Sequence, residues 1–200
     1  VILSKTSALE QNVDYTLTVD GTLTSAEDVN ITFKATDAKG LFTTSVVHLH
    51  VNGIPNIRGF TTSLPARMVP GTVVKMRVTG VVDPETDTYD GIIYSVSSTS
   101  DKIIFSKSAN ITIGEDVTVS IKDDAVEGDS YSLLFTFKDK DGGITTKSLV
   151  SSFNVAPNMS GIDFNLPAKV IPGKAYTLTM SGATDLDGDT LIYFDEKDLS

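Results

Sequence analysis

The chain repeats itself at an offset of 102 residues, and this self-similarity limits its possible folds more than any other feature, because each copy must form the same structural unit. The early part of the repeat aligns Pro55-Asn56 with Pro157-Asn158, Leu64-Pro65-Ala66 with Leu166-Pro167-Ala168, and Pro70-Gly71 with Pro172-Gly173. The later part aligns Phe33 with Phe135 and Asp37 with Asp139. Only the region from Tyr89 to Gly91 departs from this offset, and beyond it Tyr94 matches Tyr193 at an offset of 99.

The boundaries between copies fall at two similar segments in which a proline ends an apolar run. These segments are Asn52-Gly53-Ile54-Pro55-Asn56 and Asn154-Val155-Ala156-Pro157-Asn158. This phasing predicts one complete module at 55–155, the C-terminal half of a preceding module at 1–54, and the N-terminal half of a following module at 156–200.

The two terminal halves are not expected to fold by themselves, because each would expose an apolar sheet face and unpaired strand edges. The chain opens at Val1 without an initiator methionine, so we expect a window cut from a longer tandem array. The alternative complement for each half is the opposite half of a second copy, which would build an open filament.

The apolar residues of the middle module alternate with polar ones at period two, as in the run from Ser132 to Phe137, and this pattern is typical of half-buried strands. Seven strands are expected, near 57–63, 73–81, 91–97, 102–106, 116–121, 130–138 and 144–154. That number of strands in about 100 residues predicts an all-β fold of tandem Greek-key sandwiches of the immunoglobulin type. The chain has neither Trp nor Cys, so the core is expected to consist of Phe, Tyr, Leu, Ile and Val.

The overall charge argues against two classes of partner. Sixteen Lys and Arg face 26 Asp and Glu, for a formal net charge of −10, which disfavours nucleic acids and anionic membranes. The lack of cysteine excludes disulfides, zinc–thiolate sites and cysteine nucleophiles.

The repeated segments of the chain, in their order along it, resemble those of the cadherin-like and dystroglycan-type immunoglobulin-like repeats of large bacterial surface proteins. The most specific piece is the stretch Asp185-Leu186-Asp187-Gly188-Asp189-Thr190-Leu191-Ile192-Tyr193, which the middle copy replaces by Asp83-Pro84-Glu85-Thr86-Asp87. The resemblance implies a stalk or an adhesive array of cadherin-like modules outside the cell.

The acidic triplets place three carboxylates at alternate positions, which can bring oxygens to one side of a loop as Ca²⁺ requires. The carboxylates are Asp83, Glu85 and Asp87 in the middle copy and Asp185, Asp187 and Asp189 in the third. The resemblance implies calcium at module junctions, with linker oxygens from Asn52, Asn56, Asn154 and Asn158 completing the shell. The alternative is that the acidic residues only form solvated turns.

Other polar groups are weaker candidates for chemistry. Asp37, Asp139 and Asp141 are explained by hairpin turns, and His48 and His50 share one strand face without an evident third ligand. Sequons for glycosylation begin at Asn30, Asn110 and Asn158. Carboxylates are also the catalytic groups of glycosidases, so an enzyme of that class is a further alternative. Repetition of whole modules, however, is typical of scaffolds rather than of single active sites.

We therefore expect a non-enzymatic structural or adhesive segment of a long extracellular, cell-surface protein, acting as a stalk, spacer or fibre subunit stiffened by calcium. Its partners would be neighbouring modules, further copies of itself, or a cell-surface or glycan ligand. The alternative is a module that binds carbohydrate or protein through loops at one end.

Overall fold

A computed structural model describes residues 2–19, 27–85 and 91–193, and every regular element in these ranges is a β-strand. The strands before the middle module are β1 (Ile2–Leu3), β2 (Leu17–Thr18), β3 (Glu27–Thr36) and β4 (Phe42–Val51). Those within it are β5 (Thr61–Thr62), β6 (Val73–Thr79), β7 (Ile93–Ser98), β8 (Ile103–Phe105), β9 (Ile111–Thr112), β10 (Asp116–Ile121), β11 (Ser130–Lys138) and β12 (Ile144–Ser152). Two short strands follow, β13 (Asp163–Phe164) and β14 (Met180–Ser181). None of these ranges contains a helix that could cross a bilayer.

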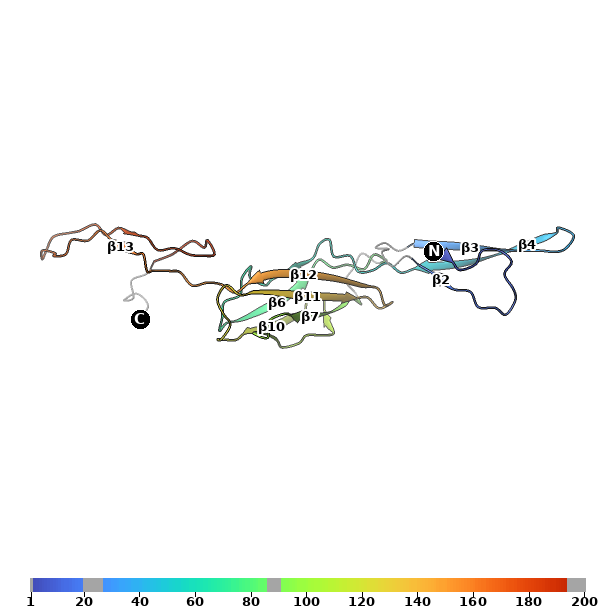
Figure 1. The fold of residues 1–200 in the computed structure, drawn as a ribbon, viewed down its shortest axis with the longest axis horizontal. Coiled ribbons are helices and arrows are strands. Elements are labelled where there is room, and N and C mark those ends of the chain that lie inside the picture. Colours follow the sequence, from blue (N-terminus) through green and yellow to red (C-terminus); the bar gives the residue numbers. More distant parts are fainter. Residues whose placement is uncertain (1, 20–26, 86–90, 194–200) are drawn as a thin grey trace.

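The middle module consists of two four-stranded antiparallel sheets. One has the strand order β5-β6-β10-β8 and the other β12-β11-β7-β9. Figure 1 shows this pair of sheets at the centre of an elongated chain. Six of the seven expected strands appear close to their predicted places, whereas the first is reduced to β5. The short strand β9 was not anticipated, because two residues are too few to show an alternating pattern.

The hydrophobic core lies between these two sheets. Alternate residues of β11 point into it, so that Tyr131, Leu133, Phe135 and Phe137 are all buried. The ring centroids of Phe60 and Phe135 lie 5.3 Å apart in a tilted arrangement, a geometry that aromatic pairs favour.

The expected composition of the core was incomplete. Met68 and Met76 are fully buried in it, beside the expected aromatic and aliphatic residues. A flexible thioether side chain can fill irregular space between two sheets.

The segments outside the middle module form small separate sheets. β3 pairs with β4 over ten residues in a long hairpin, β1 pairs with β2, and β13 pairs with β14. Figure 1 shows the β3–β4 hairpin at one end of the molecule and β13 at the other, with the two larger sheets between them. The cluster of buried apolar side chains in the described residues lies within 68–153.

The hydroxyl of Tyr94 is a buried polar group of this core. It has no hydrogen-bond partner within residues 2–19, 27–85 and 91–193, and its burial raises the pKa of Tyr94 to about 12. An unsatisfied buried hydroxyl costs on the order of 1–3 kcal/mol, so we expect Tyr94→Phe to leave stability unchanged or to raise it by about 1 kcal/mol. Urea unfolding of the chain measures this effect, and a loss above 1 kcal/mol would show that the hydroxyl does have a partner.

Candidate functional site at the module junction

Polar side chains from three separate segments meet at one end of the middle module. Asn52 follows β4, Asp83 and Glu85 follow β6, and Asp139 follows β11. The Asn52 amide nitrogen donates to Asp139 Oδ2 at 3.1 Å, and the Gly53 amide donates to Glu85 Oε1. The linker between the first half-module and the middle module is thus tied to both acidic loops.

Hydrogen bonds within two turns hold the carboxylates of Asp83 and Asp139 in place. Asp83 Oδ1 accepts the Glu85 amide at 2.9 Å, and Asp139 Oδ1 accepts the amides of Asp141 and Gly143 at 3.0 and 2.8 Å. These are the turns that the sequence predicted. They are not solvated, however, because Asp83 is only 1% exposed and Asp139 only 3%.

Among the described residues, no ion pair offsets the carboxylates of this cluster. Burial, and then the hydrogen-bonded Asp83 carboxyl, raise the pKa of Glu85 above its ordinary value. Two buried oxygens, Asn52 Oδ1 and Glu85 Oε2, have no hydrogen-bond partner in the described part of the chain. The ion pairs within residues 2–19, 27–85 and 91–193 do not involve Asp83, Glu85 or Asp139.

Carboxylate and amide oxygens are the donors that Ca²⁺ takes, so the chemistry of this cluster fits a hard divalent cation. The space is also tight, since a Cβ added at Gly143 would overlap Asp139 and lie 2.9 Å from the Asn52 amide nitrogen. In the described part of the chain, no three acidic or histidine side chains converge into a ready-made metal shell. A cation would therefore have to draw the oxygens together, with Asn52 contributing its unpartnered carbonyl.

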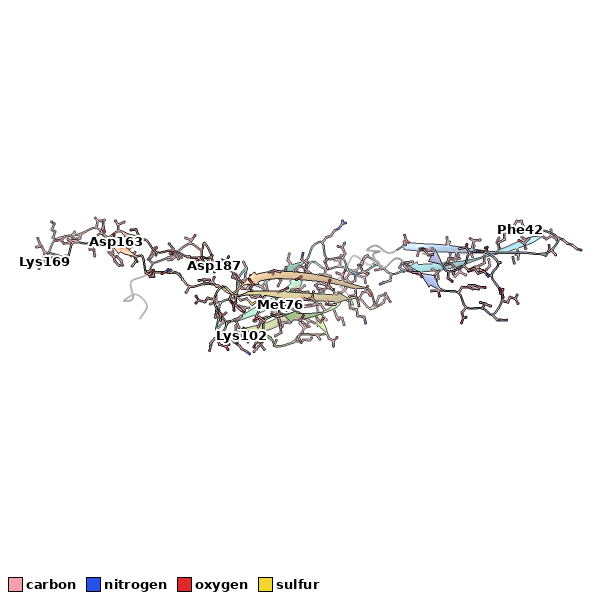
Figure 2. All side chains as sticks on the ribbon, viewed as in Figure 1. Phe42, Met76, Lys102, Asp163, Lys169 and Asp187 are labelled. Atoms are coloured by element: carbon pink, nitrogen blue, oxygen red, sulfur yellow. The ribbon has the colours of Figure 1, made fainter. Side chains whose placement is uncertain are left out.

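The second junction, at Val155, has the same bond between linker amide and acidic loop as the first, but its other contacts differ. The Val155 amide donates to Asp187 Oδ2 at 2.8 Å, just as the Gly53 amide bonds Glu85 one period earlier. Asp187 is labelled in Figure 2 beside one end of the central sheets. Here Arg67 supplies the positive charge, since its Nη1 lies 2.9 Å from Asp187 Oδ1 and 3.0 Å from the Asp187 carbonyl oxygen.

The remaining predicted ligands are placed as follows. Asp185 Oδ1 accepts the amides of Asp187 and Asp189 in a turn, and Asp189 is exposed. Asn154 donates to the carbonyl of Val155 and lines a cavity with Asp185 and Asp189. Asp87 lies outside the described residues.

The side chains of Asn56 and Asn158 turn back on their own loops, where each Oδ1 accepts the amide two residues later. The two linker asparagines therefore differ in role from Asn52, whose oxygen is left without a partner.

The histidines occupy one face of β4, as expected, opposite polar residues of β3. His48 Nδ1 lies 2.6 Å from Asn30 Oδ1, and His50 Nδ1 lies 2.8 Å from Asp28 Oδ1. The Asp28 hydrogen bond raises the pKa of His50. Cross-strand hydrogen bonding accounts for these histidines without a metal ion.

Sequence reasoning underrated Asp139 and missed Arg67. The sequence around Asp139 indicates only a turn, because its turn is explained locally and its burial depends on distant residues. Arg67 follows Leu64-Pro65-Ala66 with no motif around it, and its contact with Asp187 spans 120 positions.

No protein-family model matches the sequence, and no curated protein matches it. Among solved structures, one that is similar is a nucleoside hydrolase-related hypothetical protein from Saccharophagus degradans that is associated with carbohydrate metabolism. The two chains are 20% identical, with a TM-score of 0.38, over 51% of this chain and 26% of the other. The present chain thus matches about a quarter of that protein's length. A likeness of this size carries no argument about function.

Proposed function

We propose that the chain is a non-enzymatic structural or adhesive segment of an extracellular repeat protein, in which short linkers hold successive modules end to end as a stalk, spacer or fibre. The observation that carries the proposal is the tying of each linker to the next module. Gly53 and Val155, one period apart, each donate a backbone amide to an acidic loop of the module that follows. Linkers bonded in this way resist bending, which suits a spacer.

The strand order supports modules of the immunoglobulin type with Greek-key connections. In that fold the first, second, fifth and fourth strands share one sheet, and the third, sixth and seventh share the other. The order β5-β6-β10-β8 fits the first sheet, and the order β12-β11-β7 fits the second, with β9 as an addition at its edge.

Calcium at the first junction is part of the same proposal. Asp83, Glu85 and Asp139 supply carboxylates there, and Asn52 supplies an amide oxygen from the linker. A bound divalent cation would neutralise the buried charge and join the linker to both acidic loops. The chain's own residues orient the ligands, because backbone amides hold one oxygen of each of Asp83, Glu85 and Asp139.

The second junction is stiffened by different means. Arg67 places a guanidinium against Asp187, whose side chain is only 8% exposed, so this acidic loop has a built-in counter-ion. The first junction is therefore the one that responds to calcium, and the second depends on Arg67.

We expect calcium to raise the melting temperature of the 200-residue chain, because a ligand that binds only the native state stabilises it by mass action. At a hundredfold excess over Kd the gain is about 2.7 kcal/mol, which for a module of this size is on the order of 10 °C. Glu85→Gln should remove most of the rise, whereas Asp101→Asn, which changes an exposed acid outside the cluster, should leave it intact. Scanning calorimetry in calcium and in chelator measures both, and equal melting temperatures for the wild-type chain would rule out the calcium site.

The pH dependence follows from the raised pKa of Glu85. A carboxyl with a raised pKa in the native state destabilises that state when ionised, so the cost is present at pH 7 and disappears as the pH falls toward the ordinary value for Glu. In chelator, Glu85→Gln should therefore be more stable than wild type at pH 7, and the difference should shrink near pH 5. A constant difference over this range would contradict the assignment.

Stiffness is tested separately by small-angle X-ray scattering at low protein concentration. A spacer should give an extended profile whose maximum dimension is better defined in calcium than in chelator. A compact profile would argue against the spacer function even if calcium binds.

A further inference from the structure

We propose that the β3–β4 hairpin carries a site for a divalent transition-metal ion, which His48 and His50 bind through their Nε2 atoms. Cu²⁺ is the ion that this site should hold most tightly, because affinity for nitrogen ligands rises along the first-row metals up to Cu²⁺. The ligands are imidazole nitrogens rather than carboxylates, so the inference does not rest on calcium at the junction.

The spacing of the two histidines brings them to one face of the hairpin. His48 and His50 are two residues apart in β4, so their side chains project from the same side of the strand. Both are exposed, and they line a hollow of about 400 Å³ together with Asp28, Asn30 and Leu49. They are the only histidines of a chain without cysteine, so a site with imidazole or thiolate ligands has to lie here.

Hydrogen bonds already orient both rings as a metal site requires. Asn30 Oδ1 lies 2.6 Å from His48 Nδ1, and Asp28 Oδ1 lies 2.8 Å from His50 Nδ1. A carbonyl oxygen and an ionised carboxylate only accept, so each Nδ1 carries the proton and each neutral ring keeps a lone pair on Nε2. Metal-binding histidines usually donate their other nitrogen to such an oxygen, which fixes the tautomer. The cross-strand bonds thus account for one nitrogen of each ring and leave the other for a metal ion.

The charges around His50 favour a cation. The hydrogen bond to Asp28 raises the pKa of His50, and the charges of Asp28, Glu85 and Asp141 raise it further. The same negative charges attract a metal ion to this face. In the described part of the chain, no third His, Cys, Asp or Glu side chain completes a ready-made shell, so water would fill the remaining positions.

This face stays open when a module is complete. The counterparts of His48 and His50 one period later are Val150 and Ser152 of β12, in the finished middle module. Val150 is 78% exposed there, and Ser152 is half-buried. The face therefore lies on the outer side of its sheet, away from the core, where an ion can reach it.

The middle module also supplies the matched variant. His48→Val combined with His50→Ser gives β4 the two residues that β12 carries in a well-paired strand, so the hairpin should be retained. Asp28→Ala removes the acceptor that positions His50 and leaves both Nε2 atoms in place. The control is Asp101→Asn, which changes an exposed acid of the middle module.

The test titrates the 200-residue chain with Cu²⁺ in a calorimeter at about pH 7.5, above the ordinary pKa of histidine. Electron paramagnetic resonance then counts the nitrogens bound to the ion. We expect one Cu²⁺ per wild-type chain, with two imidazole nitrogens, and the same for Asp101→Asn. His48→Val alone should leave one nitrogen, and the double variant none. Asp28→Ala should keep both nitrogens but weaken binding by about 10–100-fold.

Three results would overturn the proposal. The first is a wild-type chain that binds no Cu²⁺, and the second is a bound Cu²⁺ whose spectrum shows no imidazole nitrogen. The third is a double variant that binds Cu²⁺ as wild type does, because carboxylates would then hold the ion. An unchanged affinity in Asp28→Ala would remove Asp28 from its positioning role.

Discussion

Replacing Gly80 by alanine is expected to destabilise the middle module by about 2–6 kcal/mol, which is a large part of the 5–15 kcal/mol that a domain normally has. Gly80 has φ +74°, a left-handed conformation that costs other residues on the order of 1–3 kcal/mol. A Cβ at this position would also overlap the carbonyl group of Gly59, which is backbone and cannot rotate away. Forced repacking at such a contact costs about 1–3 kcal/mol more.

The control for Gly80→Ala is Gly114→Ala. Gly114 has φ +84°, but nothing lies within 4 Å of a Cβ built there, so only the conformational cost applies. Urea unfolding should place Gly80→Ala well below Gly114→Ala in stability. Equal losses would mean that the approach of Gly59 to Gly80 does not constrain the fold.

The same close approach recurs one period later, where a Cβ at Gly182 would overlap the carbonyl oxygen of Gly161. The sequence shows that Gly80 aligns with Gly182, but it does not show which segment crosses that position. The repeat therefore indicates that a glycine is needed at this position of the module. The reason, which is the close approach of Gly59 or Gly161, is visible only in the folded chain.

Local patterns predicted most of the strands, because period-two alternation acts over a few neighbouring residues. The strand expected at 130–138 is β11 with the same bounds. The strand expected at 57–63 is only Thr61–Thr62, since the backbone of Phe60 turns back to bond Ile57. A turn of this kind has no signal in hydrophobic periodicity.

The candidate site was predictable to a similar degree. The spacing of Asp83 and Glu85 and the repeated linker pattern around Asn52 indicate a junction. In the structure Asp83 accepts the amide of Glu85, and Glu85 accepts the amide of Gly53, the neighbour of Asn52. Asp139 joins them from 87 positions beyond Asn52. Its turn is encoded locally, but its burial at the junction arises from the pairing of β11 with β7 and β12, which no short motif records.

Phe135→Ala is expected to cost about 3–5 kcal/mol, because it removes a fully buried ring and leaves a cavity between the two sheets. Phe135 is 0% exposed and contacts the rings of Phe60 and Tyr94, with centroids 5.3 and 6.2 Å away. Those rings come from outside β11, so the cavity cannot be closed by moving one strand alone.

The matched control is the next residue, because adjacent residues of a strand face opposite sides of the sheet. Leu134 is 44% exposed, so Leu134→Ala should cost less than about 1 kcal/mol. Both variants should be measured by urea unfolding of the 200-residue chain, following the transition of the middle module. Because the alternation of β11 assigns Phe135 to the core and Leu134 to the surface, similar losses for the two variants would mean that β11 does not present its alternate residues to the core as described.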